Sequence, residues 1–233
     1  MAASDAPVLL ITGGSTGIGA ASAKAAVASG YRVALGARHL DAVQQLAEEL
    51  GGPSTALASA CDVTDPDSLS AFVAATEAAF GGIDAVFANA GVGGSPGGFC
   101  GANPASWKTL LLTNVYGVGL TIQACAPALK ASRGHLLITG SAAGRATIPG
   151  SMYSASKWAV SAIGYGVREE LRGTGVRVTL IEPGMVDTPF FDQPPEHALT
   201  DTDVANSVIY ALSQPESVDV NEILLRPTPP ITE

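Results

Sequence analysis

The stretch that decides the fold is Thr12-Gly13-Gly14-Ser15-Thr16-Gly17-Ile18-Gly19, which joins the apolar run at 8–12 to a helical pattern ending near Ser29. Glycine at 13, 17 and 19 lets the backbone turn tightly and approach a bound group, because glycine carries no Cβ. The free N–H groups at the start of the helix, together with its dipole, favour a phosphate. The turn therefore predicts a pyrophosphate site, or else a tight turn that only packs the helix on the strand.

Short β-branched runs alternate with longer helical patterns along the chain, which is typical of a parallel sheet covered by helices on both faces. The expected strands are 8–12, 31–36, 55–60, 83–88, 135–139, 176–181 and 222–225. The expected helices end near 29 or span 40–50, 66–80, 104–132, 152–172 and 200–212, while 91–103 and 183–199 are expected to be irregular. No repeat or linker divides the sequence, so we expect one doubly wound, Rossmann-like α/β domain over residues 1–233.

Composition narrows the class of partner and the compartment. The net charge is −9, which argues against nucleic acid and anionic membranes as partners. Cys61, Cys100 and Cys125 have no metal-ligand spacing and are expected to be free thiols in a reducing cytosol. Residues 1–7 do not have the pattern of a signal peptide, and we expect no apolar stretch long enough to cross a bilayer. These features predict a cytoplasmic protein.

Further motifs follow the glycine turn in a fixed order. Asn89-Ala90-Gly91 follows the expected fourth strand, and Pro183-Gly184-Met185-Val186-Asp187-Thr188 follows the sixth. With the T-G-x-x-x-G-x-G turn, these segments resemble the short-chain dehydrogenase/reductase family across about residues 8–188. The resemblance implies hydride transfer with a nicotinamide dinucleotide, and a homotetramer or homodimer formed through the helices at 104–132 and 152–172. It also implies a catalytic tetrad of Asn114, Ser141, Tyr153 and Lys157.

The residues after the second strand bear on the choice of cofactor. An NAD enzyme would place a carboxylate there to accept from the ribose, whereas this chain has Ala37-Arg38-His39. The Arg38 guanidinium can pair with a 2′-phosphate, which predicts NADP(H), although Arg38 could also be a solvated surface charge. NAD(H) stays open, because many NADP-using relatives carry a basic residue where this chain has Ser15 and Thr16. The resemblance implies that Asp62 contacts the adenine with the Val63 backbone nearby; Asp62 could equally be a turn residue.

Tyr153 and Lys157 lie four residues apart in an expected helix, so they share one face of it. A tyrosine pKa of about 10 is too high for a proton shuttle at neutral pH. A nearby ammonium lowers that pKa, and three pH units correspond to roughly 4 kcal/mol. Ser141 follows the fifth strand at the ligand-facing edge of the sheet, where its hydroxyl can donate to a substrate oxygen. In isolation, such a Tyr–Lys spacing is common by chance.

Other roles rest on the resemblance alone. It implies that Asn114 holds a water linking Lys157 to solvent, although Asn114 could be a polar core residue satisfied by backbone. It also implies that Pro183 and Gly184 shape the wall beside the nicotinamide. Val186 would meet its carboxamide through the backbone, and Thr188 would hydrogen-bond to the cofactor.

The substrate pocket is expected from 93–99, 143–152 and 185–191, with an apolar lining. Arg145 is the nearest candidate to clamp a carboxylate, and its direction is open. A ketone, an aldehyde, a hydroxy acid or a secondary alcohol would all be compatible with this pocket. Two rival readings are a non-catalytic dinucleotide-binding sensor, and an epimerase or dehydratase with tightly held NAD.

Overall fold

The computed structural model describes residues 6–191, 193 and 195–229, and at its centre lies a seven-stranded parallel sheet of order β3-β2-β1-β4-β5-β6-β9. The strands are β1 (Val8–Thr12), β2 (Arg32–Ala37), β3 (Ala56–Ala60), β4 (Ala85–Ala88), β5 (His135–Thr139), β6 (Arg177–Pro183) and β9 (Glu222–Leu225). The strand order reverses between β1 and β4, where doubly wound sheets open a ligand crevice. Residues 1–5, on which the signal-peptide expectation mainly rests, lie outside the described part.

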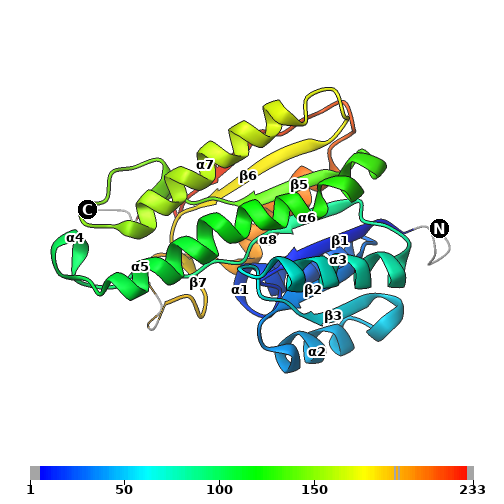
Figure 1. Ribbon diagram of the computed structural model, residues 1–233, viewed down its shortest axis with the longest axis horizontal. Coiled ribbons are helices and arrows are strands. Elements are labelled where there is room, and N and C mark those ends of the chain that lie inside the picture. The colour runs from blue at the N-terminus through cyan, green and yellow to red at the C-terminus, as the bar shows by residue number, and fades with distance from the viewer. Residues whose placement is uncertain (1–5, 192, 194, 230–233) are drawn as a thin grey trace.

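Helices cover both faces of this sheet (Figure 1). One face carries α3 (Pro66–Phe80), α6 (Gly117–Ser132) and α7 (Met152–Glu170), and the other carries α1 (Gly17–Ala28), α2 (Leu40–Glu49) and α8 (Asp201–Ser213). Strand side chains alternate between two apolar layers: Leu10 and Leu136 enter the first, Leu9 and Leu137 the second. The predicted doubly wound α/β fold is therefore confirmed, with most element ends within two residues of expectation.

Two segments expected to be irregular contain short regular elements. A single helical turn, α4 (Gly98–Gly101), follows Gly97, which adopts the left-handed region at φ 102°. The strands β7 (Val186–Asp187) and β8 (Leu199–Thr200) pair with each other in parallel. Elements of two to four residues are too short to show a hydrophobic period, which is why the sequence pattern misses them.

The expected helix at 104–132 is continuous but changes its winding. It runs as α5 (Pro104–Leu111), a π-helical segment η3 (Leu112–Tyr116) and α6. By length and a mean hydropathy of 1.3 it meets the criteria for a membrane span, which the core helices of globular proteins can also meet. The expectation concerned an uninterrupted apolar stretch, and this helix carries Lys108 and Lys130. Its α6 part packs against α3, β4 and β5, as expected for a helix that covers the sheet.

Candidate active site

The glycine turn between β1 and α1 leaves no room for side chains. Gly13 has φ 66°, and a Cβ there would lie 2.8 Å from the Cα of Ala90. A Cβ on Gly19 would lie 2.2 Å from the carbonyl oxygen of Gly13, and one on Gly17 would meet Thr188 at 3.1 Å. Because the first N–H groups of a helix have no helical acceptor, the start of α1 beside this bare backbone fits a pyrophosphate.

Asn89 ties the carboxyl ends of three strands together at this turn. Its Nδ2 donates to the carbonyl oxygens of Thr12 (3.3 Å) and Gly13 (3.1 Å), and its Oδ1 accepts from the Thr139 hydroxyl at 3.0 Å. The carboxyl ends of β1, β4 and β5 are thus held side by side by one side chain. These strand ends form the bottom of the crevice.

A cavity of about 990 Å³ runs along this edge of the sheet and brings the predicted site residues together. Two of them lie behind its wall: Gly19, which packs against Gly13, and Asn114, which is 1% exposed. The others line the cavity: Gly13, Ser15, Thr16, Gly17, Ile18, Arg38, Asp62, Val63, Asn89, Ala90, Gly91, Ser141, Tyr153, Lys157, Pro183, Gly184, Val186 and Thr188.

Arg38 and Asp62 stand at the end of the cavity formed by β2 and β3. The Oδ1 atom of Asp62 accepts from the backbone N–H and the hydroxyl of Thr64 at 2.9 and 2.8 Å. These hydrogen bonds, helped by the charge of Arg38, lower the pKa of Asp62 from its usual value. Asp62 is therefore a turn residue that also lines the cavity, and its contact with the adenine stays a prediction.

Ser141, Tyr153 and Lys157 converge where β5, β6 and α7 meet. The Ser141 hydroxyl accepts from the Ala143 N–H at 3.1 Å and donates to the Pro183 carbonyl at 3.4 Å. The Nζ of Lys157 lies 5.7 Å from the centre of the Tyr153 ring and donates to a backbone carbonyl of β5 at 2.7 Å. All three polar groups thus reach the same part of the cavity.

The titration of this group differs from the sequence prediction. Burial raises the pKa of Tyr153 above its usual value, and a hydrogen bond from Ser141 offsets part of that rise. Burial also lowers the pKa of Lys157 to about 8. The prediction that Lys157 lowers the pKa of Tyr153 is therefore wrong for the chain alone, because the ammonium faces a carbonyl of β5 and desolvation dominates. The phenol is protonated at neutral pH and can donate its proton.

Asn114 lies in the π-helical segment η3 and holds a loop. Its Oδ1 accepts from the Val92 N–H at 2.8 Å, and its Nδ2 donates to the Val92 carbonyl at 2.9 Å and to the Ser156 hydroxyl at 3.3 Å. This is the arrangement of the alternative reading, a buried amide satisfied largely by backbone. A π-bulge widens the helix and is frequent at functional sites. The water relay through Asn114 stays a prediction.

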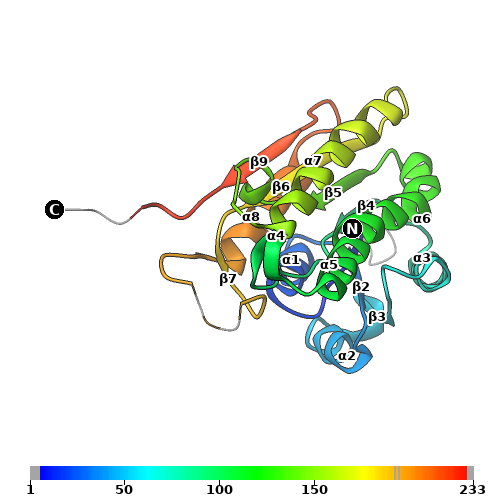
Figure 2. The same cartoon turned by 60° about the vertical axis from the view of Figure 1, so that its left-hand side comes forward.

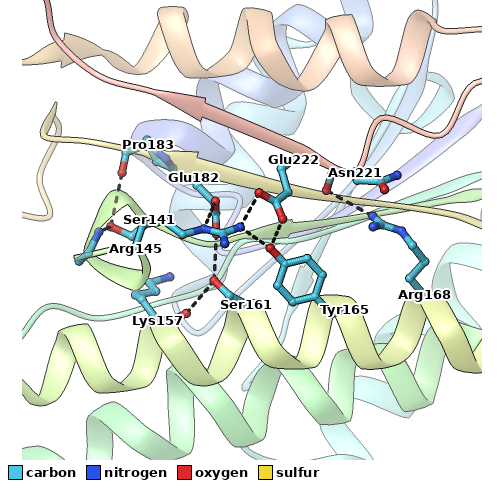
Figure 3. A network of polar contacts seen from close by, with 11 residues as sticks. Ser141, Arg145, Lys157, Ser161, Tyr165, Arg168, Glu182, Pro183, Asn221 and Glu222 are labelled. Atoms are coloured by element: carbon cyan, nitrogen blue, oxygen red, sulfur yellow. Dashed lines mark hydrogen bonds and ion pairs between the residues drawn. The ribbon is translucent and has the colours of Figure 1, made fainter. Parts of the chain in front are cut away.

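Arg145 does not line the cavity, and its side chain reaches Glu182, Glu222 and Tyr165 instead, which settles its open direction (Figure 3). Its Nε lies 2.8 Å from Oε2 of Glu182, whose side chain is fully buried and also accepts from Ser161 at 2.9 Å. Arg145 also pairs with Glu222 on β9. This network joins the loop that carries Ser141 to the end of β6. Arg145 therefore positions backbone and is not a clamp for substrate.

The far end of the cavity is largely apolar, as expected. Ile148, Met185, Phe190 and Phe191 line it, and the Phe190 ring meets the ring of Tyr153 edge-on at 5.7 Å. Sequence reasoning missed the wall contributed by α5 and η3 (Thr109, Leu112 and Thr113), and it missed Arg226. A signal for Arg226 was present, since it directly follows the last expected strand and carboxyl ends of strands face the crevice.

Comparison with known proteins agrees with this geometry. The family model described as short chain dehydrogenase matches residues 7–198. Dehydrogenase/reductase SDR family member 11 of Gallus gallus is 34% identical over 97% of this chain and 97% of its own. The structure of an alcohol dehydrogenase from the archaeon Thermococcus sibiricus, complexed with 5-hydroxy-NADP, is 31% identical with a TM-score of 0.87, covering 97% of this chain and 99% of that one. A metagenomic short-chain oxidoreductase in complex with NADP is 33% identical with a TM-score of 0.84, covering 98% and 100%.

Proposed function

The chain belongs to the short-chain dehydrogenase family, and from this premise we propose that it transfers a hydride between NADP(H) and a ketone, an aldehyde or a secondary alcohol. The observation that carries the proposal is the convergence of Ser141, Tyr153 and Lys157 in the cavity that the glycine turn also lines. A sensor that only binds a dinucleotide would not need an acid, a hydrogen-bond donor and a cation at one point. We also propose that residues 1–233 form one catalytic domain.

Each polar group then has a separate task. When bound, the nicotinamide supplies the hydride in reduction and accepts it in oxidation. Tyr153 gives its phenolic proton to the substrate oxygen in reduction and removes it in oxidation, and Ser141 donates a hydrogen bond to that same oxygen. Lys157 holds the cofactor ribose and favours the phenolate electrostatically once Tyr153 has lost its proton. Its hydrogen bond to the Thr139 carbonyl keeps Nζ directed to this spot.

The remaining cavity residues would hold the cofactor. The backbone from Gly13 to Gly19 faces the pyrophosphate, and Asp62 with Val63 receives the adenine. Pro183 and Gly184 form the wall at the nicotinamide; Val186 and Thr188 offer it polar contacts.

Members of the family use nicotinamide dinucleotides, and we propose NADP(H) for this chain. Arg38 is exposed and lines the cavity beside Asp62, where its guanidinium can pair with a 2′-phosphate. Two solved relatives that match over nearly the whole chain hold NADP or an NADP derivative, which supports the same choice. An NAD(H)-dependent member of the family is the alternative.

We also propose a homodimer or homotetramer assembled through α5, α6 and α7. Large apolar side chains stand exposed on α5, on α7 and on η3, which joins α5 to α6: Leu111, Leu112, Tyr116, Trp158 and Tyr165. Burial of such a surface in a partner would remove apolar area from water. A monomer in sedimentation at micromolar concentration would overturn this assembly.

We also propose a cytoplasmic location, which agrees with Cys61, Cys100 and Cys125 being unpaired.

The test is oxidation of NADPH and NADH against a panel of ketones and aldehydes, in wild type and in Tyr153→Phe. We expect turnover with NADPH in wild type, and a loss of at least 100-fold in Tyr153→Phe, the size of a general acid contribution. NADPH binding, followed by its fluorescence, should persist in that variant. Tyr210→Phe, on the exposed face of α8, is the matched control and should keep full turnover. An active Tyr153→Phe enzyme would contradict the mechanism, and wild-type NADPH binding without turnover would favour the sensor.

A further inference from the structure

The side chains that line the cavity carry a net positive charge, whereas the whole chain is negative. The protein carries a net charge of −9. Yet the described residues that line the cavity include Arg38, Lys157 and Arg226 against one carboxylate, that of Asp62. Three cations facing one anion in an acidic protein indicate a site built for negatively charged ligands. The proposed function uses Arg38 and Lys157 and leaves Arg226 without a task.

Arg226 is fixed beside Gly184, in the wall that the proposed function puts at the nicotinamide, where the substrate would receive the hydride. It follows β9, which pairs with β6 so that Leu225 lies opposite Pro183, and the Gly184 N–H donates to the Leu225 carbonyl at 2.8 Å. A Cβ added to Gly184 would lie 3.5 Å from Cγ of Arg226, so the stem of the arginine rests on that glycine. β9 forms an edge of the sheet, and residues 226–229 run outward from it (Figure 2).

This position separates Arg226 from the adenosine end. β9 and β2 are five strand positions apart in the sheet, which at about 4.8 Å per strand is roughly 24 Å between the strands preceding Arg226 and Arg38. Pro183, which pairs with Leu225, accepts through its carbonyl from the Ser141 hydroxyl at 3.4 Å, so Arg226 lies at the end of the cavity where Ser141 stands. The neighbouring lining is apolar and offers it no counter-ion.

The guanidinium of Arg226 is available to a ligand. It forms no ion pair or side-chain hydrogen bond with any residue in the described ranges, whereas Arg145 is fully engaged by Glu182 and Glu222. A guanidinium presents paired N–H donors that match a carboxylate. We propose that Arg226 anchors the carboxylate of the substrate, which makes oxo acids and hydroxy acids the preferred class. This inference rests on the proposed function, because it assigns the substrate of that same site.

The experiment compares acids with their uncharged esters. The probes are 3-oxobutanoate, 4-oxopentanoate and 5-oxohexanoate, each against its methyl ester, so that the distance between carbonyl and carboxylate is scanned. We expect wild type to prefer at least one acid in kcat/KM. In Arg226→Met the ratio of acid to ester should fall by about 10- to 100-fold, the range given by hydrogen bonds to a charged group. Arg226→Lys should keep part of the preference.

Controls separate this anchor from general damage and from cofactor binding. Arg172→Met, at an exposed position just after α7 and paired only with Glu169 in the described chain, should keep the wild-type ratio. If Arg226 bound the cofactor, Arg226→Met would weaken NADPH binding and lower acid and ester rates together, which would overturn the inference. So would a wild type that treats acids and esters alike.

A binding measurement keeps the anchor testable even without turnover. By calorimetry on the NADP⁺-loaded protein, pentanoate should bind more tightly than pentanamide, and Arg226→Met should abolish the difference. Absence of NADPH oxidation with every carbonyl would refute the proposed function, while the pentanoate result would still decide the anchor. Equal binding of acid and amide in wild type would refute the anchor alone.

Discussion

Replacement of Lys157 by methionine should stabilise the folded protein while removing its activity. The side chain is 5% exposed, and burial lowers its pKa from 10.5 to about 8. At about 1.4 kcal/mol per pH unit, the buried charge costs roughly 3 kcal/mol of folding free energy at neutral pH. The variant also loses the hydrogen bond to the Thr139 carbonyl, which lowers its stability by about 1 kcal/mol. Lys157→Met should therefore be more stable by about 2 kcal/mol at pH 7, the difference of these two terms.

The sign of the pH dependence makes the test specific. Between pH 8 and 10.5 the unfolded chain keeps a proton on Lys157 that the folded chain has released, so the stability of wild type rises with pH there. Burial raises the pKa of Cys61 and Cys125 to about 12, which lowers stability above pH 9, but equally in both proteins. Urea unfolding of both proteins at pH 7, 8, 9 and 10 gives the difference curve. An advantage of Lys157→Met that is absent at pH 7, or constant up to pH 10, would refute the reasoning.

Three further changes follow from the same site. Arg38→Asp should raise the KM for NADPH by about 10- to 100-fold and spare NADH, because it removes a charge-assisted contact; unchanged NADPH kinetics would remove the basis for the cofactor choice. Arg145→Met should lower the free energy of unfolding by about 3 kcal/mol, measured with urea, because the buried Glu182 carboxylate then has no cation beside it. Adding Glu182→Gln to that variant should restore most of the lost stability, and a single variant as stable as wild type would contradict the pairing. Oxidation should accelerate about tenfold per pH unit between pH 6 and 7.5, where Lys157 keeps its charge, while reduction does not, because burial raises the pKa of Tyr153 and oxidation needs its phenolate; a flat oxidation profile would speak against Tyr153 as the base.

The local sequence pattern is enough to predict the helices, the strands and the edge of the sheet where the strands end. Apolar runs of five or six residues separated by glycine specify buried parallel strands, and parallel strands bring their carboxyl ends to one edge. That rule predicts Ser141 at the ligand-facing edge, and the family resemblance adds Asn89; the structure brings both to the cavity that the glycine turn lines. The four-residue spacing of Tyr153 and Lys157 likewise needed only the helical period.

The directions of several side chains and the pKa of Tyr153 could not be predicted from the sequence, because they depend on residues far apart in the chain. The direction of Arg145 is set by Glu182 and by Glu222, the latter on the last strand. The side chain of Asn114, in the π-helical segment, is held by the backbone of Val92, which lies 22 residues earlier and bonds to both ends of the amide. The pKa of Tyr153 was misjudged for a related reason: helical spacing gives the proximity of Lys157, whereas burial is a property of the assembled site.

Two buried charges at this site are handled in opposite ways, and the contrast bears on function. The Glu182 carboxylate receives a guanidinium and a hydroxyl, so its charge is compensated within the fold. Lys157 receives a carbonyl oxygen and no carboxylate from any described residue, and it meets burial by giving up its proton more easily. A chain with nine negative charges in excess could readily have supplied an acid. Lys157 therefore keeps a cost in stability that no described carboxylate offsets, and the exposed Arg226 has no ion-pair partner among the described residues. These two cations are better guides to the ligands than the compensated Arg145.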